Sequence, residues 1–292
     1  MPRRFGDLFL GVGAMKAGTT WLYAALNRHP QLFFTTEKEL HYFFNRYCNP
    51  GLSAHLAYLK YINDRILRPR PEDSPLPPVT RAERLRTNLH WIAAWPIRPL
   101  ADPWYARLFA QAPPDAWHCD FSNLSALLPA EAWTRIAGQC DRLRVLYTMR
   151  NPVERLWSQT RFNLQMQGMS DQAGSWGADE FSAFVRRPQF WAHAEYGAVL
   201  RRLHAGLPGG CLKPVIFEQL HADPRAGLAE IETFLDIPPG PYPRWLMTKR
   251  INATPEVPVP GFFADLVAQD VTRILHEVTE EGIAVPAGWW PG

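Results

Sequence analysis

The chain has 292 residues, of which 47% are hydrophobic and 20% are charged, a composition typical of a soluble globular protein rather than a disordered one. Lysines and arginines exceed aspartates and glutamates by only three, so we expect no nucleic-acid partner, although a local anion pocket is compatible with this balance. The four cysteines lie far apart and form no CxxC pair, which argues against a disulfide framework or a structural zinc site and favours a reducing, cytoplasmic location. No apolar run reaches the roughly 18 residues of a membrane span.

The chain opens with a predicted strand–loop–helix unit. Residues 8–12 form a short apolar run bounded by glycine, which is the pattern of a buried parallel strand. Residues 19–28 have apolar side chains at helical spacing, and the pair His29-Pro30 ends that helix. The loop between them reads GVGAMKAGTT. Because strand, glycine-rich loop and helix follow in that order, backbone N–H groups and a helix N-terminus meet at one point, which predicts an anion-binding site.

Two more strand–helix units follow. The first has a strand over 143–148 and a helix that begins after Asn151, with this asparagine as the N-cap and Glu154 in position to complete a capping box. The second has a strand over 211–217 and a helix that begins at 223–224.

A last amphipathic helix is predicted over 262–278. The repeated strand–helix order predicts an α/β fold in three layers, with a central, mostly parallel sheet and helices on both faces. We expect a single domain over 1–292. Residues 64–118 break the pattern with ten prolines and four tryptophans, and we interpret them as a partly helical elaboration on that domain.

The glycine loop differs from a Walker A loop. That loop places a lysine directly after the second glycine of GxxxxGK[ST], whereas Lys16 precedes Gly18 by two residues. The signature of a nucleoside triphosphate site is therefore absent. Lys16 still offers one cation, and Thr19 and Thr20 offer two hydroxyls, to a phosphate-like ligand beside the backbone N–H groups.

Two motifs on these strand–helix junctions point to one family. Residues 15–22, MKAGTTWL, resemble the 5′-phosphosulfate loop of sulfotransferases that use 3′-phosphoadenosine 5′-phosphosulfate (PAPS), although Met15 stands where that family usually has proline. Residues 150–158, RNPVERLWS, resemble its 3′-phosphate motif, an arginine at a strand end and a serine eight residues later. The resemblance covers most of the chain and is weakest over 50–115. It implies transfer of a sulfuryl group from PAPS to a hydroxyl or amine of a carbohydrate or small-molecule acceptor.

The resemblance assigns roles to residues of both motifs. Lys16 would bind the bridging oxygen of the leaving nucleotide and stabilise its developing charge. The 5′-phosphate would be held by backbone and hydroxyl donors of the residues that follow, Ala17, Gly18, Thr19 and Thr20. Arg150 and Ser158 would bind the 3′-phosphate. No HExxH or paired Cys/His spacing is present, so we expect no metal ion.

Four further residues carry two interpretations each. Trp21 would stack on adenine by similarity to family members with Thr-Thr-Trp, and plain packing against the sheet is the alternative. Lys249 and Arg250 match a family loop that closes over the cofactor phosphates, and a solvated basic pair is the alternative. For Arg155 we favour an ion pair on the helix surface over a ligand contact.

The catalytic base is inferred from residues 37–44, EKELHYFF, which resemble the Glu-x-His-Phe-Phe stretch of heparan-type carbohydrate sulfotransferases, the subgroup nearest in motif. In those enzymes the glutamate is the base, which implies Glu39 here. Small-molecule sulfotransferases use a histidine instead, so His41 is the second candidate and His118 the third. Phe121 stands where the heparan-type enzymes have a lysine, and this leaves a sugar, a smaller molecule or an apolar acceptor open.

Two other classes of function are weighed against a sulfotransferase. A P-loop kinase needs a Walker lysine and a magnesium-binding carboxylate after a strand, and neither is evident. A non-catalytic nucleotide-binding module would keep the sheet and lose the chemistry. The joint presence of Lys16, Glu39, Arg150 and Ser158 favours the enzyme.

Overall fold

The computed structural model describes residues 4–35, 37–50, 83, 86, 101–248 and 258–291. These residues contain one five-stranded sheet, with strands in the order β2-β3-β1-β4-β5 and every neighbouring pair parallel. The strands are β1 (Asp7–Gly11), β2 (Leu32–Phe34), β3 (Trp117–Phe121), β4 (Arg142–Met149) and β5 (Leu212–Ile216). The predicted strands over 8–12, 143–148 and 211–217 are confirmed to within one residue at each end.

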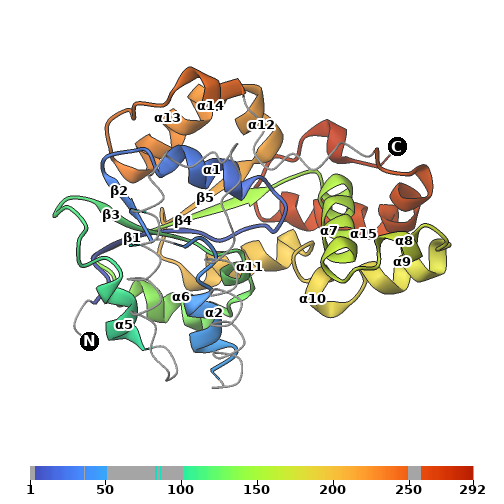
Figure 1. Cartoon of the computed structure of the whole chain (residues 1–292), viewed down its shortest axis with the longest axis horizontal. Coiled ribbons are helices and arrows are strands. Elements are labelled where there is room, and N and C mark those ends of the chain that lie inside the picture. Colours follow the sequence, from blue (N-terminus) through green and yellow to red (C-terminus); the bar gives the residue numbers. More distant parts are fainter. Residues whose placement is uncertain are drawn as a thin grey trace.

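Helices cover both faces of the sheet, so the predicted three-layer α/β fold is confirmed (Figure 1). One face carries α1 (Thr19–Leu26), α12 (Phe217–Ala222), α13 (Pro224–Leu235) and α14 (Arg244–Thr248). The other carries α2 (Tyr42–Tyr47), α5 (Asp102–Arg107), α6 (Ala130–Ala137) and α11 (Tyr196–Gly206). Side chains alternate along each strand. Leu8 and Leu10 of β1 therefore pack under the helices α2, α5, α6 and α11, and Phe9 packs under α1, α12, α13 and α14. Both faces of the central strand are therefore apolar, which explains its unbroken hydrophobic run.

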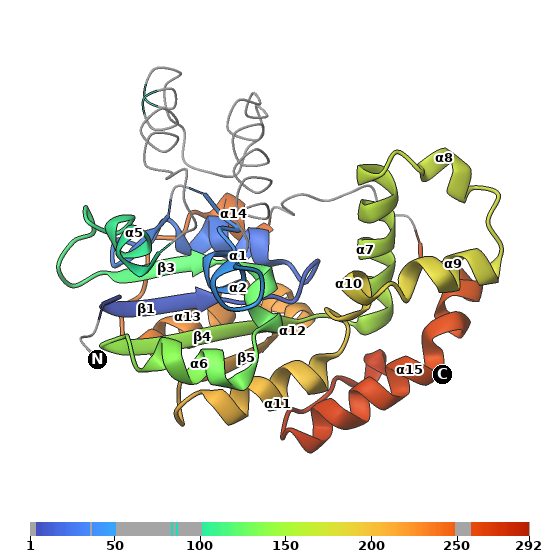
Figure 2. The same cartoon turned by 90° about the horizontal axis from the view of Figure 1, so that it is seen from below.

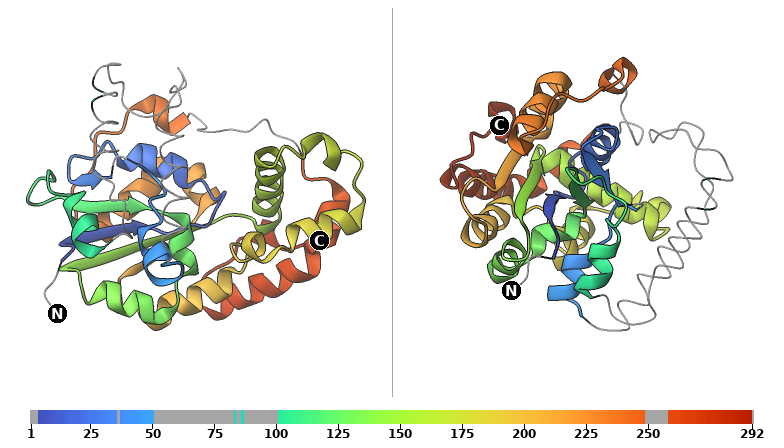
Figure 3. Two further views of the ribbon diagram at one scale, coloured as in Figure 1. Left: turned by 60° about the horizontal axis from the view of Figure 1, so that its bottom comes forward. Right: turned by 90° about the vertical axis from the view of Figure 1, so that its left-hand side faces the viewer.

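A further group of helices lies beside the sheet, at the end of the molecule where the chain terminates (Figures 2 and 3). It consists of α7 (Pro152–Met166), α8 (Ser170–Ala173), α9 (Ala178–Val185), α10 (Pro188–Trp191) and α15 (Gly261–Glu280). The long helix α15 contacts α7, α9 and α11 and so joins this group to the sheet domain. The prediction over 262–278 is confirmed as α15. Two short 3-10 turns complete the described elements, η1 (Asn123–Leu127) and η2 (Ala287–Trp289). No helix in the described ranges is long and apolar enough to cross a membrane.

The start of α7 confirms one predicted contact and corrects another. Asn151 is the N-cap, and its side-chain oxygen accepts hydrogen bonds from the N–H groups of Val153 (3.0 Å) and Glu154 (3.2 Å). The predicted capping box is wrong, because the Glu154 carboxylate accepts from Arg150 at 2.7 Å instead. The N–H of Asn151 donates to Glu218 of α12 at 2.9 Å. A carboxylate distant in the sequence thus replaces the local partner.

The predicted elaboration over 64–118 lies mostly outside the described residues. Its described part contains α5, and its last residues, Trp117 and His118, begin β3. This strand pairs with β1 on one side and β2 on the other, so it belongs to the interior of the sheet. Neither β2 nor β3 was predicted, because β2 has only three residues and the WHCDF sequence of β3 mixes polar and apolar residues.

Candidate active site

The candidate residues gather at one edge of the sheet. Because the strands are parallel, the loops that follow β1, β3, β4 and β5 all leave from the same side. These loops carry the glycine-rich segment, residues 122–123, Arg150 and Phe217. The sheet topology therefore brings together motifs that lie more than 100 residues apart in sequence.

Phe217 joins the two sequence motifs directly. Gly18 has a φ of +78°, and a Cβ atom built on it would lie 2.4 Å from the Phe217 ring. No other residue type fits this position without movement of the ring or the loop. The same ring lies under the Arg150 guanidinium, 4.9 Å from it. The glycine loop and the residue before the N-cap of α7 thus both pack against one aromatic residue of α12.

The N-terminus of α1 lacks a side-chain cap. Gly18 occupies the N-cap position, and no side chain satisfies the first-turn N–H groups. Thr19 and Thr20 are the first two residues of the helix. Their N–H groups and hydroxyls lie where the sequence predicts an anion site, at the positive end of the helix dipole.

Lys16 is a partly buried cation that packs on an aromatic ring. Its ammonium lies 4.8 Å from the ring centre of Phe162 on α7, and no carboxylate of the described ranges forms an ion pair with it. Burial lowers the pKa of Lys16, and the charges of Arg150, Arg161 and Lys38 lower it further. The loop therefore carries a surplus of positive charge that an anionic ligand would offset.

Glu39 is tied to the glycine loop through Lys38. The Lys38 ammonium donates to the Thr19 hydroxyl at 3.2 Å and also to a carboxylate oxygen of Glu39. The other carboxylate oxygen accepts from the N–H of Asn123 at 2.7 Å. Burial by itself would raise the pKa of Glu39, but the charges of Lys38 and His41 and these hydrogen bonds outweigh it and lower the pKa. Glu39 is thus a partly buried, ionised carboxylate beside the anion loop.

A second chain of hydrogen bonds positions His41. Its backbone N–H donates to Ser122 Oγ at 3.0 Å, and Ser122 donates to Asp120 Oδ1 at 2.7 Å. Tyr105 donates to the other Asp120 oxygen at 3.1 Å. The His41 ring places Nδ1 3.8 Å from Glu39 Oε2. These supporting residues were not predicted from the sequence. Their only local signal is the polar pair Asp120 and Ser122 at the end of β3.

His118, the third candidate for the base, is wrong. It pairs in register with Leu8, whereas the site begins beyond Gly11, three residues further along the strand, or roughly 10 Å away. Its Nδ1 lies 2.8 Å from the carbonyl oxygen of Phe5, and its ring stacks on Phe109 at 4.6 Å. These contacts hold it at the opposite end of β3.

The two members of the predicted 3′-phosphate motif lie on the same junction. Arg150 directly follows β4, and its guanidinium pairs with Glu154 at 2.7 Å. Ser158 is half-buried on α7, six residues after the first residue of that helix. The structure thus keeps both side chains on the segment that starts at the carboxyl end of β4.

The remaining predicted residues are placed differently. Trp21 is 3% exposed, its indole N–H donates to the carbonyl of Leu246 at 3.0 Å, and its ring contacts His221. The packing interpretation therefore describes its position. Lys249 and Arg250 lie outside the described residues. Among the described side chains, no group of three or more His, Cys, Asp or Glu could hold a metal ion.

Arg155 corrects the sequence interpretation. It is fully buried, not part of an ion pair on the helix surface. Its Nη1 donates to Gln159 Oε1 at 2.6 Å and to the carbonyl of Met15 at 3.3 Å. Arg155 lies on the buried side of α7 together with Leu156 and Gln159. Its hydrogen bond to Met15 shows that this side faces the glycine loop.

Comparison with known proteins decides the family. The profile of the sulfotransferase family matches residues 9–241, which span the glycine loop, Glu39, the Arg150 motif and α13. The chain belongs to the sulfotransferase family. It is therefore an enzyme of the sulfotransferase class.

Solved sulfotransferase structures share the fold across almost the whole chain. A sulfotransferase from Alicyclobacillus acidocaldarius has a TM-score of 0.59 at 17% identity and covers 99% of this chain and 98% of its own. The sulfotransferase domain of the Synechococcus PCC 7002 olefin synthase has a TM-score of 0.51 at 17% identity, with 98% of each chain covered. A sulfotransferase from Mycobacterium avium has a TM-score of 0.53 at 14% identity and covers 96% of this chain and 78% of its own. A search of curated proteins gave no match. At these identities the structures establish the fold, and they do not single out the heparan type as nearest.

Proposed function

We propose that this sulfotransferase uses PAPS and transfers its sulfuryl group to an acceptor hydroxyl, with Glu39 as the general base. The observation that carries this proposal is the position of Glu39. It is partly buried, its pKa is lowered, and Lys38 connects it to Thr19 in the first turn of α1. A base in this place lies next to the loop where the family holds the group to be transferred.

The residues present fit such a cofactor. Lys16 has a positive charge with no counter-ion in the described ranges, and the first turn of α1 has N–H groups with no side-chain cap. Arg150, backed by Phe217, supplies a second cation on the neighbouring loop. We propose Lys16, Gly18, Thr19 and Thr20 as the 5′-phosphate group, and Arg150 with Ser158 as the 3′-phosphate group.

PAPS, when bound, supplies a sulfuryl group on a bisphosphate leaving group. In the proposed reaction, the Glu39 carboxylate accepts the proton of the acceptor hydroxyl as that oxygen forms its bond to sulfur. Lys16 stabilises the negative charge that develops on the leaving oxygen as the old bond breaks. Lys38 holds Glu39 in the ionised form, so the base is ready at neutral pH. Catalysis of this kind depends on positioning and charge stabilisation.

The acceptor is proposed as a class, a carbohydrate or a small molecule that bears a hydroxyl. We further propose that residues 1–292 act as one catalytic domain, since β1 to β5 and the glycine loop form a single site.

Calorimetry tests the cofactor. We expect the bisphosphate product of PAPS to bind more tightly than ATP or ADP; preference for ATP would instead support a kinase. Labelled PAPS incubated with small molecules and glycans of a native lysate then identifies an acceptor by mass spectrometry. Nucleotide binding without any labelled product would support a non-catalytic module.

Substitution of Glu39 tests the base. Glu39→Gln keeps the size and should lower turnover by at least about 100-fold while nucleotide affinity stays within a few-fold. Glu230→Gln on α13, a carboxylate 70% exposed and paired with Lys213, is the matched control. An active Glu39→Gln enzyme together with an inactive His41→Ala enzyme would assign the base to His41.

A further inference from the structure

One face of α7 presents buried hydrogen-bond donors that have no acceptor within the described ranges. Arg155, Gln159 and Asn163 lie at intervals of four residues, with exposed fractions of 0%, 2% and 7%. Among the described residues, the Nε and Nη2 atoms of Arg155, Nε2 of Gln159 and Nδ2 of Asn163 have no hydrogen-bond partner. Because Gln159 Oε1 accepts from Arg155 at 2.6 Å, its Nε2 is fixed as the donor that points away.

Two of the three guanidinium nitrogens of Arg155 have no acceptor in the part of the chain that the structure describes. Nη1 makes both of its hydrogen bonds, to Gln159 and to the carbonyl of Met15. Nε and Nη2, which point to the same side of the planar group, remain available together. Two parallel donors in one plane match the two oxygens of a carboxylate. No carboxylate in the described ranges pairs with Arg155, and an arginine does not escape this by losing its proton.

The described groups that act on the charge of Arg155 include no carboxylate. The Tyr196 and Tyr147 hydroxyls and the Arg150 guanidinium act on its charge. Tyr196 already donates to the carbonyl of Arg150 at 2.9 Å, and the buried Tyr147 hydroxyl has no hydrogen-bond partner among the described residues. The neighbourhood is thus rich in donors and poor in acceptors.

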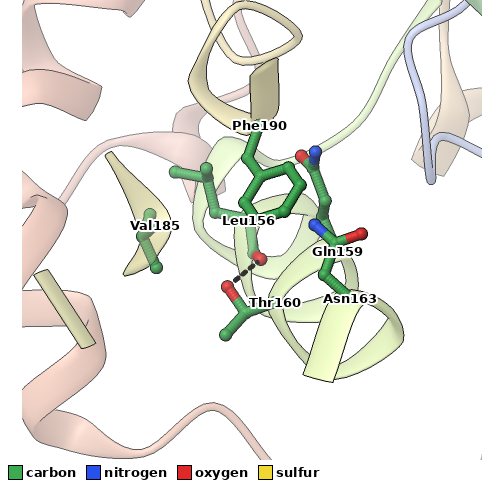
Figure 4. A pocket seen from close by; sticks show the side chains of 6 residues that line it. All are labelled: Leu156, Gln159, Thr160, Asn163, Val185 and Phe190. Atoms are coloured by element: carbon green, nitrogen blue, oxygen red, sulfur yellow. Dashed lines mark hydrogen bonds between the residues drawn. The ribbon is translucent and has the colours of Figure 1, made fainter. Parts of the chain in front are cut away.

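This face of α7 adjoins the catalytic residues. His193, 2% exposed, lies close enough to both Arg155 and Glu39 for their charges to act on it. Figure 4 shows the carboxamides of Gln159 and Asn163 beside the ring of Phe190, where both side chains line a narrow, closely packed crevice. The donors lie on α7, which is the helix of the group beside the sheet that follows β4 directly.

Further along α7 the same face becomes apolar and exposed. Phe162, which packs on Lys16, is 37% exposed, and Met166 one turn later is 60% exposed. A molecule placed along this face would meet buried donors at Arg155 and apolar contacts at Phe162 and Met166. This arrangement matches a molecule with an anionic end and an apolar body.

From this juxtaposition we propose that Arg155, Gln159 and Asn163 form an acceptor subsite that binds a carboxylate, so that the substrates are hydroxy acids with an apolar body. The single fixed charge of Arg155 matches a monoanion, whereas Lys16 and Arg150 serve the nucleotide. The inference rests on the proposed function, because it assigns the acceptor of the same active site.

Calorimetry on the protein saturated with the bisphosphate nucleotide tests the subsite. The probes are 12-hydroxydodecanoate and 4-hydroxyphenylacetate, each compared with its uncharged amide. We expect at least one acid to bind roughly 10- to 100-fold more tightly than its amide, the range of a charge-assisted hydrogen-bond pair. Equal binding of acid and amide, or binding of neither acid, overturns the subsite. Failure of the bisphosphate nucleotide itself to bind would overturn the proposed function instead.

Two substitutions separate recognition from folding. Arg155→Lys keeps the charge but loses the fork, and should abolish the preference for the acid while nucleotide affinity is retained. Gln159→Glu provides an internal carboxylate beside Arg155, so it should raise the melting temperature and also remove acid binding. Arg201→Gln on α11, paired with Glu277, removes one positive charge at a distant surface and should change neither. Retained acid preference in both Arg155→Lys and Gln159→Glu contradicts the inference.

Discussion

Lys38 donates a 3.2 Å hydrogen bond to the hydroxyl of Thr19, and this contact connects the segment that bears the proposed base to the first turn of α1. The same ammonium pairs with Glu39. A ligand that reorganises the first turn of α1 would therefore act on the base through one side chain. Lys38 is in this respect a positioning residue, since it acts through Glu39.

Replacement of Lys38 should shift the acid limb of the pH–rate profile. Lys38 is the main reason that the pKa of Glu39 is lowered despite burial, so Lys38→Met leaves the burial effect dominant and raises this pKa. Activity should then be lost at a higher pH as the solution is acidified, and turnover at pH 7 should fall as well, because Glu39 also loses the contact that positions it. Lys213→Met, a surface lysine paired with Glu230, is the control. An acid limb that does not move would show that Lys38 does not set the ionisation of Glu39.

Lys16 should set the alkaline limb of kcat/KM. Its pKa is lowered by burial and by neighbouring cations, so it loses its proton, and its charge, at a lower pH than the ordinary value of 10.5. Because kcat/KM reports the free enzyme, its alkaline limb should lie below 10.5. The bound anionic nucleotide favours the protonated form, so the limb in kcat should lie at higher pH. If the alkaline limb of kcat/KM lies at the same pH in wild type and in Lys16→Arg, the titration belongs to another group.

Turnover should persist in EDTA. Lys16 provides the charge that we propose to stabilise the leaving oxygen, a task that kinases give to magnesium. Rates measured with and without chelator should agree within a factor of about two. Loss of activity in EDTA, with recovery on addition of a divalent ion, would contradict the role of Lys16.

Arg150 should make the protein bind nucleotides with a 3′-phosphate more tightly than nucleotides without one. Arg150→Ala is expected to weaken binding of the bisphosphate nucleotide by about 1.5–3 kcal/mol, the range for a hydrogen bond to a charged group. Binding of adenosine 5′-phosphate, which lacks the 3′-phosphate, should change little. Glu154→Ala frees Arg150 from its ion pair and should leave binding equal or tighter. If both nucleotides lose affinity equally, Arg150 contacts another part of the ligand.

Local signals explain what could be predicted from the sequence. The glycine loop and the Asn151 cap depend on contacts within a few residues, such as the bonds from Asn151 to the first turn of α7. The apolar runs of β1 and β4 reflect burial on both faces of a parallel sheet. These features determine the family and the positions of Lys16 and Arg150.

Contacts between distant residues explain what could not be predicted. Glu218 replaces Glu154 at the Asn151 N–H, and Asn123 holds Glu39 across 84 positions. Arg155 is polar in sequence, yet the path of the glycine loop buries it. Neither spacing nor composition signals such partners, because they depend on which loops the sheet order brings together.

Asp120 should make stability depend on pH. It is 1% exposed, accepts hydrogen bonds from Ser122 and Tyr105, and has a pKa that burial raises from 3.8 to about 6. Between these two values the folded chain keeps a proton that the unfolded chain has released. The free energy of unfolding contributed by Asp120 therefore falls as pH rises through this window, by on the order of 3 kcal/mol in total.

Urea unfolding of wild type and Asp120→Asn measures this effect. The amide does not titrate, so the stability of wild type relative to Asp120→Asn should decrease steadily from pH 4 to about pH 6 and then level off, because above the folded pKa both states of Asp120 are ionised. Asp115→Asn, an exposed residue just before β3, provides the matched control for the change from carboxylate to amide. A difference between wild type and Asp120→Asn that stays constant over this range would show that Asp120 titrates alike in the folded and unfolded chains. The Tyr105–Asp120–Ser122 chain would then position His41 through an ordinary ionised carboxylate.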